Sequence, residues 1–235
     1  MAAEIIRCPD DRALAGEAAR QWWSKLQARG EDPFTVALSG GRITQLFYAE
    51  VAARAPRSAL KEVHFFWADE RCVPPDHSDS NFALARASLL EPLQIPAEQI
   101  HRLRGEADPA FALEEADAEL CRVAELRADG MPMLDLVLLG MGEDGHVASL
   151  FPGAAPEVER ATTPFLHIAR SPKPPPRRLT LSYAALAAAR EVWVLASGKG
   201  KEAAFRESLS PAGTTPLAKV IRSRSQTRVF TDIKM

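Results

Sequence analysis

Short apolar runs alternate with helical patterns along this chain, and no other feature restricts its fold as strongly. Runs that predict strands cover residues 34–38, 63–67, 134–139, 191–196 and 227–231. Several of them are apolar at all but one position, so we expect both of their faces to be buried. Strands of this kind, separated by helices, are typical of α/β folds. The sequence therefore predicts a mainly parallel sheet with helices on both faces.

Between the apolar runs, hydrophobic residues recur at helical spacing. A first helix carries Leu14 to Leu26 on one face, and Gly30 is expected to end it. A second helix follows residue 42, and a third covers residues 81–90 until Pro92, which lacks a backbone donor. A fourth helix is predicted over residues 199–209, whereas residues 152–164 and the proline-rich stretch 171–176 are expected to be loops. Residues 177–181, directly after the prolines, are a further candidate strand.

Size and composition restrict the class of protein. With 235 residues and 46% hydrophobic composition, the chain can bury one sizeable core, so we expect a single domain over residues 1–235. A net charge of −2 provides no basic field for nucleic acid or an anionic membrane. Three widely spaced cysteines argue against a disulfide framework, and no run approaches the roughly 20 apolar residues of a membrane span. We expect a soluble, cytoplasmic protein.

A glycine turn, Ser39-Gly40-Gly41-Arg42, joins a predicted strand to a predicted helix. Backbone amides at such a turn, together with the helix N-terminus, could hold a phosphate. The turn lacks both the GxxxxGK[ST] spacing and the GxGxxG pattern, so a nucleotide is not implied. A tight strand-to-helix turn with no ligand is the alternative at this point.

Three charged residues, Asp69-Glu70-Arg71, follow the strand at 63–67 directly, and we expect them to be exposed at its tip. Arg71 could bind a phosphate or carboxylate through two hydrogen bonds, and Asp69 could orient a histidine or a substrate hydroxyl. A solvated run of charges would have the same pattern.

Residues 140–152 are the most informative segment, because they place His146 beside three glycines and two carboxylates directly after an apolar strand. Histidine has an ordinary pKa of about 6.5 and can act as a general base near neutral pH. The other four histidines lack such a setting, and no HExxH spacing indicates a metal site.

A serine nucleophile is disfavoured, because the chain has no GxSxG elbow. Direct attack by water fits better than an acyl-enzyme. Basic residues also gather near predicted loops: Lys173 and Arg178 lie within and just after the proline-rich stretch, and residues 197–201 follow a strand and open a helix. Together these cations suggest a pocket for an anion.

Six motifs in order resemble those of the 6-phosphogluconolactonases, in the glucosamine/galactosamine-6-phosphate isomerase superfamily. They cover residues 38–42, 67–74, 79–81, 140–152, 173–181 and 197–201. The resemblance implies a Rossmann-like α/β domain, related in fold to the glucosamine-6-phosphate deaminases and ribose-5-phosphate isomerases. One departure is Arg42-Ile43-Thr44, where many members have a threonine-proline pair after the serine or arginine.

The resemblance implies hydrolysis of 6-phospho-D-glucono-1,5-lactone to 6-phospho-D-gluconate, the second step of the oxidative pentose phosphate pathway. His146 would be the base that activates water, with Asp69 and Arg71 as further catalytic residues. Substrate or phosphate would be held by Ser39, Gly40, Gly41, Arg42, Asn81, Gly142, Asp144, Gly145, Lys173, Arg178 and Lys201. We expect no metal, no cofactor and no nucleic-acid or membrane partner, only a small phosphosugar lactone bound to a monomer.

Two alternatives stay open. The deaminase branch shares the glycine-aspartate-glycine-histidine element but continues with isoleucine-alanine-phenylalanine-asparagine-glutamate-proline, whereas this chain continues Val147-Ala148-Ser149-Leu150-Phe151-Pro152. A non-catalytic sugar-phosphate sensor would need a DNA-binding segment, for which the helix at residues 14–26 leaves no room. Turnover distinguishes a sensor from an enzyme.

Overall fold

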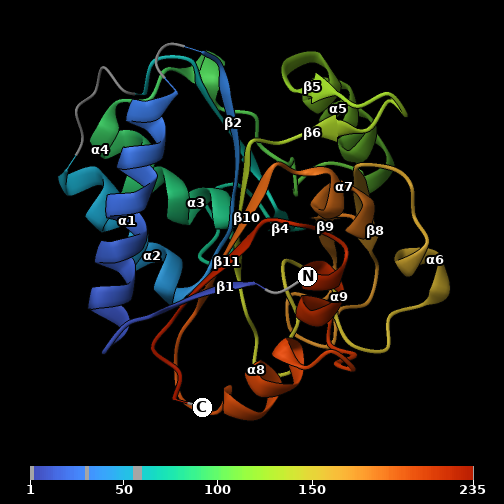
Figure 1. Ribbon diagram of the computed structural model, residues 1–235. Helices are drawn as coiled ribbons and strands as arrows, with labels where there is room; N and C mark the ends of the chain where they lie inside the picture. Colours follow the sequence, from blue (N-terminus) through green and yellow to red (C-terminus); the bar gives the residue numbers. More distant parts are fainter. Residues whose placement is uncertain (1–2, 30–31, 55–59, 235) are drawn as a thin grey trace.

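The computed structural model describes residues 3–29, 32–54 and 60–234. Its centre is a six-stranded sheet with the order β1-β11-β10-β7-β2-β3, in which all neighbouring strands run parallel (Figure 1). The strands are β1 (Glu4–Arg7), β2 (Phe34–Leu38), β3 (Val63–Trp67), β7 (Leu136–Gly140), β10 (Glu191–Ala196) and β11 (Thr227–Thr231). The predicted parallel sheet is confirmed.

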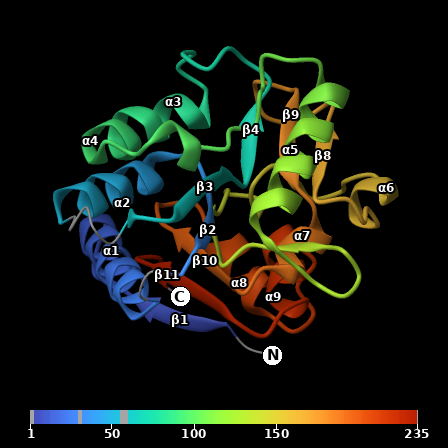
Figure 2. The same cartoon turned by 90° about the horizontal axis from the view of Figure 1, so that it is seen from above.

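Helices cover both faces of this sheet, as the sequence predicts (Figure 2). On one side lie α1 (Asp11–Ala28) and α2 (Arg42–Ala53), and on the other α7 (Tyr183–Ala188), α8 (Glu202–Leu209) and α9 (Pro216–Arg222). Helix α1 begins where the Asp10 side chain accepts a hydrogen bond from the Ala13 amide at 2.8 Å. Gly30, its expected end, lies outside the described residues.

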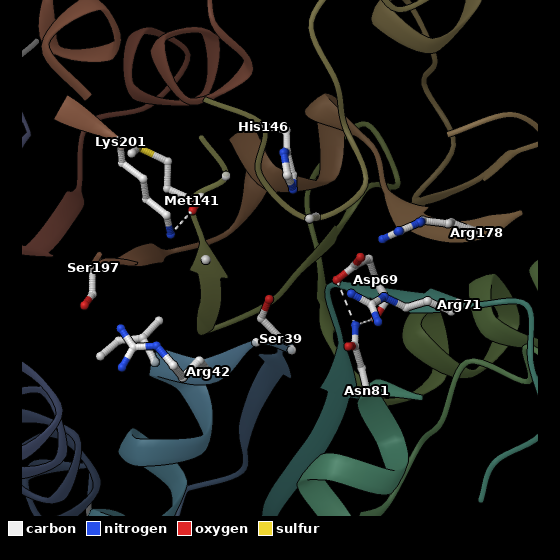
Figure 3. Close-up of a pocket in the computed structure, with 16 residues that line it drawn as sticks. Ser39, Arg42, Asp69, Arg71, Asn81, Met141, His146, Arg178, Ser197 and Lys201 are labelled. Atoms are coloured by element: carbon white, nitrogen blue, oxygen red, sulfur yellow. Dashed lines mark hydrogen bonds between the residues drawn. The ribbon is translucent and has the colours of Figure 1, made fainter. Parts of the chain in front are cut away.

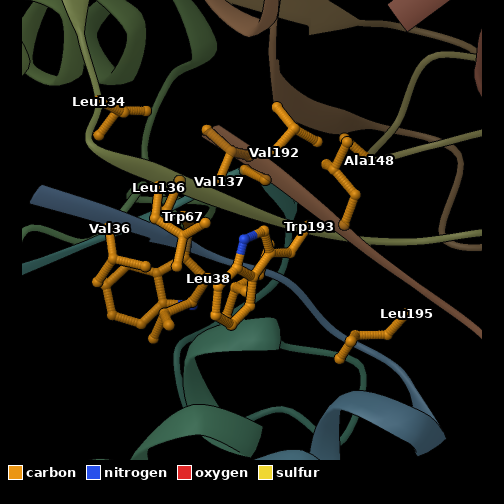
Figure 4. Close-up of a cluster of buried hydrophobic side chains, with 14 of the residues drawn as sticks. Val36, Leu38, Trp67, Leu134, Leu136, Val137, Ala148, Val192, Trp193 and Leu195 are labelled. Atoms are coloured by element: carbon orange, nitrogen blue, oxygen red, sulfur yellow. The ribbon is translucent and has the colours of Figure 1, made fainter. Parts of the chain in front are cut away.

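The core lies between these layers (Figure 4). Four consecutive strands of the sheet, β10, β7, β2 and β3, each contribute a fully buried side chain to this core. These are Trp193, Leu136, Val36 and Trp67. Because helices cover both faces, no strand needs a polar face, and this explains the continuous apolar runs in the sequence. Among the described residues, no helix combines the length and apolar character that a membrane span requires.

A second, antiparallel sheet was not predicted. It has the order β4-β9-β8, with β4 (Asp69–Arg71), β8 (Phe165–Ile168) and β9 (Arg178–Leu181). The expectation that Asp69 and Glu70 are exposed is wrong: their exposed fractions are 4% and 2%. The start of α3 binds the Glu70 carboxylate, and Asn81 and Ser149 bind that of Asp69. A three-residue strand carries no periodicity from which the sequence could reveal this burial.

Smaller elements complete the fold, and two of them correct the sequence predictions. The third predicted helix comprises α3 (Asn81–Ala85), a π-helical segment (Arg86–Leu90) and α4 (Glu91–Leu93), so it passes Pro92. The helical run ends one residue after Pro92, where Gln94 adopts a left-handed conformation, so the proline still marks its end closely. The predicted loop at 152–164 contains a single helical turn, α6 (Pro156–Glu159). The remaining elements are a 3-10 turn (Ala97–Gln99), α5 (Pro109–Val123), β5 (Glu125–Leu126) and β6 (Pro132–Met133).

Candidate active site

A pocket opens at the carboxyl ends of the parallel strands, where the strand order reverses between β2 and β7 (Figure 3). Register pairs join these two strands only at Val36–Leu136 and Ala37–Val137, so the pocket lies beyond the paired region. Open parallel sheets bind ligands at this position. Its lining consists of Ser39, Gly40, Gly41, Arg42, Ile43, Asp69, Arg71, Asn81, Gly140, Met141, Gly142, His146, Ala148, Arg178, Ser197 and Lys201.

His146 forms a pair with Asp144. The imidazole Nδ1 lies 2.5 Å from Asp144 Oδ1, and the ring packs against Phe151 with 4.5 Å between ring centroids. With Asp144 ionised, Nδ1 carries the hydrogen and Nε2 keeps its lone pair. Burial lowers the pKa of His146, although the Asp144 carboxylate opposes this shift. Burial would raise the pKa of Asp144, but the bond from His146 holds that pKa below its ordinary value.

The turn that carries His146 depends on glycine. A Cβ at Gly142 would lie 2.0 Å from His146 Nδ1, so only glycine leaves room for the ring. Gly145 has a φ of 76°, which favours glycine, and its amide donates to the Gly142 carbonyl at 3.0 Å. The Gly142 amide in turn donates to the His146 carbonyl at 2.9 Å. These bonds close the turn and aim the imidazole into the pocket.

The glycine turn after β2 forms the floor of the pocket. Tyr48 stabilises this turn, since its buried hydroxyl donates to the Ser39 carbonyl at 2.7 Å. At Gly40 a Cβ would lie 1.8 Å from Asn81 Oδ1, so the absence of a side chain lets Asn81 approach. Helix α2 begins after Gly41 without a side-chain cap. Its first-turn amides are therefore available to an anion in the pocket.

Two cationic residues, Arg42 and Lys201, lie at one end of the pocket, with Ser197 between them (Figure 3). Lys201 Nζ donates to the Met141 carbonyl at 2.6 Å, and burial lowers the pKa of its ammonium group. Arg42 forms an ion pair with Asp11 at 2.5 Å. An ammonium group has three donors, so Lys201 keeps two for a ligand.

Asp69, Arg71, Arg178 and Asn81 form the other end of the pocket. Arg71 Nη1 donates to the Asp79 carbonyl at 2.7 Å, and Arg178 Nε donates to the Pro175 carbonyl at 3.0 Å. Asp69 Oδ1 accepts a hydrogen bond from Asn81 Nδ2 at 3.1 Å. The carboxylate bonded to His146 is thus Asp144 rather than Asp69.

Most of the sequence-predicted site residues line this pocket, but three do not. Asp144 contacts the pocket through its bond to His146, and Gly145 belongs to the turn that carries His146. The third is Lys173, whose carbonyl accepts a hydrogen bond from Arg178 at 3.2 Å. The Lys173 charge still lies close enough to His146 to lower its pKa. Sequence reasoning did not include five lining residues, although each adjoins or lies within a motif already singled out: Ile43, Gly140, Met141, Ala148 and Ser197. Within residues 3–29, 32–54 and 60–234, no three His, Cys, Asp or Glu side chains are grouped as metal ligands.

Glu70 points away from the pocket and builds its wall. Its carboxylate accepts hydrogen bonds from the amides of Arg71, Asn81 and Phe82 at 2.7, 2.8 and 2.8 Å, and from Ser80 Oγ at 3.0 Å. Burial raises the pKa of this carboxyl, although these four donors oppose the shift. Glu70 therefore fixes the start of α3, and with it Asn81.

Glu70→Ala is expected to lower the free energy of unfolding by about 3 kcal/mol or more, because it leaves several buried donors without an acceptor. Urea denaturation measures the change. Glu98→Ala, which removes an exposed carboxylate, is the matched control and should stay within about 0.5 kcal/mol of wild type. Equal stability of the two variants would contradict this role of Glu70.

Sequence comparison shows which known proteins this chain is similar to. Residues 9–230 match the family model described as glucosamine-6-phosphate isomerases/6-phosphogluconolactonase. A probable chloroplastic 6-phosphogluconolactonase of Oryza sativa subsp. indica is 36% identical over 94% of this chain and 70% of its own length. The 6-phosphogluconolactonase of Mycobacterium tuberculosis is 34% identical over 90% of this chain and 88% of its own.

Comparison with solved structures points to the same family. The 6-phosphogluconolactonase of Trypanosoma brucei superposes with a TM-score of 0.86 at 29% identity, covering 97% of this chain and 95% of that one. The resemblance seen in the six motifs is thereby confirmed. The chain belongs to the family of glucosamine-6-phosphate isomerases and 6-phosphogluconolactonases.

Proposed function

We propose that this chain hydrolyses 6-phospho-D-glucono-1,5-lactone to 6-phospho-D-gluconate, the second step of the oxidative pentose phosphate pathway. The observation that carries the proposal is a histidine–aspartate pair, His146 and Asp144, beside a pocket with a cationic end. The names of the relatives support the choice of substrate. We further propose that residues 1–235 act as one domain.

In this mechanism His146 Nε2 takes a proton from water as the water oxygen attacks the lactone carbonyl carbon. Asp144 accepts a hydrogen bond from Nδ1–H, keeps Nε2 free and stabilises the imidazolium that forms. The tetrahedral intermediate collapses with cleavage of the bond to the ring oxygen, which receives the proton from His146. The second proton of the water stays on the new carboxyl group, which ionises near neutral pH to give 6-phospho-D-gluconate and the acid that is released.

Two groups carry negative charge during the reaction, the 6-phosphate of the substrate and the carbonyl oxygen of the tetrahedral intermediate. Each requires its own binding region. The amides at the start of α2, with Arg42 and Lys201, would hold the 6-phosphate, because helix N-termini and cations favour dianions. The oxyanion that develops on the carbonyl oxygen would lie near Arg71 or a backbone amide of the glycine turn. Asp69 would accept hydrogen bonds from ring hydroxyls.

The partner would be the phosphosugar lactone alone, bound to a monomer in the cytoplasm. The three cysteines, Cys8, Cys72 and Cys121, are free, which supports a reducing compartment.

The test is the release of acid from freshly generated lactone, corrected by a control without enzyme for spontaneous opening. Hydrolysis well above that background is expected. If wild type only matches the control, the proposal fails. Ammonia release from glucosamine 6-phosphate would then identify a deaminase, and binding of phosphosugars without turnover would identify a sensor.

The pH dependence provides a separate prediction. Because the neutral imidazole is the base, activity falls as His146 is protonated, and burial lowers the pKa of His146. The acid limb of kcat/KM should therefore have its midpoint below the ordinary histidine value of about 6.5. A midpoint clearly above that value, in initial rates corrected for spontaneous opening at each pH, would contradict His146 as the base.

A further inference from the structure

Ser149 is a fully buried serine whose hydroxyl is bonded to a residue of the pocket. Its Oγ donates to Asp69 Oδ2 at 2.6 Å, and its amide donates to Thr180 Oγ1 at 3.2 Å. Thr180 is the register partner of Asp69 in the antiparallel sheet. Three separate segments, β4, β9 and the turn after His146, therefore meet around Asp69.

The turn that presents Ser149 is strained. Ala148 has a φ of 48°, a left-handed conformation that a residue with a Cβ adopts at a cost of about 1 kcal/mol. The Leu150 amide closes the turn on the Val147 carbonyl at 2.9 Å. Val147, Ser149 and Leu150 are all fully buried, so packing holds the strained residue in place. Such strain is retained where a side chain must point in one direction.

The Asp69 carboxylate keeps acceptor capacity for a ligand. Two neutral donors hold it, the Ser149 hydroxyl on Oδ2 and the Asn81 amide on Oδ1. An ionised carboxylate has about four acceptor positions, so roughly two remain. Asp69 lines the pocket on the side of His146, where a sugar ring would expose its hydroxyls to it. The direction of the free lone pairs depends on the rotation of the carboxylate, to which the Ser149 bond at 2.6 Å contributes more than the longer Asn81 bond at 3.1 Å.

We propose that Ser149 is a positioning residue for substrate recognition, because its hydroxyl sets the orientation in which Asp69 accepts hydrogen bonds from the lactone hydroxyls. This inference rests on the proposed lactonase function. Ser149 acts through Asp69 and takes no part as a nucleophile, since its hydroxyl hydrogen is directed at a carboxylate rather than at His146.

Ser149→Ala is expected to raise KM for the lactone about 10- to 100-fold. This is the usual contribution of one hydrogen bond to a charged group, here the bond from a lactone hydroxyl to the misoriented Asp69 carboxylate. The value of kcat should stay within about threefold, because hydroxyl contacts are made equally in the ground state and the transition state. A variant that was only partly folded would show the opposite, a lower apparent kcat with KM unchanged.

The matched control is Ser182→Ala, which removes an equally buried serine hydroxyl that accepts a bond from the Ala185 amide at 3.1 Å. It should leave KM unchanged. In Asp69→Asn, the further change Ser149→Ala should add little to KM, because both act on the same contact. An unchanged KM in Ser149→Ala, or full additivity of the two changes, would overturn the proposal.

Crystal structures of ligand-free wild type and Ser149→Ala provide a test that needs no turnover. The Asp69 carboxylate is expected to rotate away from its wild-type orientation in the variant, and an unmoved carboxylate would overturn the proposal. Wild type that fails to open the lactone overturns the proposed function instead. The two structures then decide alone whether Ser149 orients Asp69.

Discussion

His146→Ala is expected to lower kcat for lactone hydrolysis by about 10²- to 10⁴-fold, the usual contribution of a positioned general base. His146 is the histidine that lines the pocket, and its pair with Asp144 leaves Nε2 available to water. The value of KM should change much less, because the proposed phosphate contacts are made by Arg42, Lys201 and the start of α2 and not by His146. Initial rates with freshly generated lactone measure both constants.

His64→Ala is the matched control, since His64 bonds to His101 at 2.9 Å and does not line the pocket. Its kcat should equal that of wild type. If His146→Ala loses less than about tenfold in kcat, water is activated by another group, and general-base catalysis by His146 is refuted.

Gly142→Ala is expected to lower kcat by about 10²-fold or more, although no functional group is removed. The added Cβ would lie 2.0 Å from His146 Nδ1 and 2.8 Å from Asp144 Oδ1, so the imidazole must leave its partner. Gly142 is not among the glycines with positive φ, and its backbone therefore accepts alanine. We expect the variant to fold and to bind phosphosugar while it hydrolyses the lactone slowly.

Two controls separate this displacement from a general effect of alanine. Gly16→Ala lies in α1, where a Cβ meets only Arg54 Nη2 at 3.5 Å and Glu50 Oε2 at 3.9 Å, and should leave kcat unchanged. The double variant Gly142→Ala/His146→Ala should be no slower than His146→Ala alone, because the first change acts through the second residue. Additive losses would show that Gly142 contributes independently of His146.

Strands of the parallel sheet could be predicted to the residue in several cases. The run at 34–38 coincides with β2, the run at 63–67 with β3, and the run at 191–196 with β10. Nearly all of their residues are buried, so these strands are mostly apolar, with Thr35, His64 and Glu191 as the polar exceptions. The glycine turn and the turn of His146 could be placed for the same reason, since each follows such a strand.

The antiparallel sheet and the bonds made by Asp69 could not be predicted. Asp69 lies opposite Thr180 and accepts a bond from Ser149, residues that are distant in sequence. Local patterns report periodicity and turn chemistry, but they carry no information on which distant segments pair. For the same reason the sequence suggested an exposed charge cluster at 69–71, whereas Asp69 and Glu70 are buried by contacts with Ser149 and the start of α3.

The pairing of β4 with β9 also bears on how the protein acquires its activity during folding. Asp69 and Thr180 are joined across a long stretch of chain, and closing so large a loop is entropically costly and slow compared with forming local contacts. The hydrogen bonds among Gly142, Gly145 and His146 are local, whereas Asp69 depends on a distant bond from Ser149 and on its pairing with Thr180. In a chain that is still being synthesised, these local bonds of the His146 turn can therefore form before residues 178–181 complete the wall that carries Asp69.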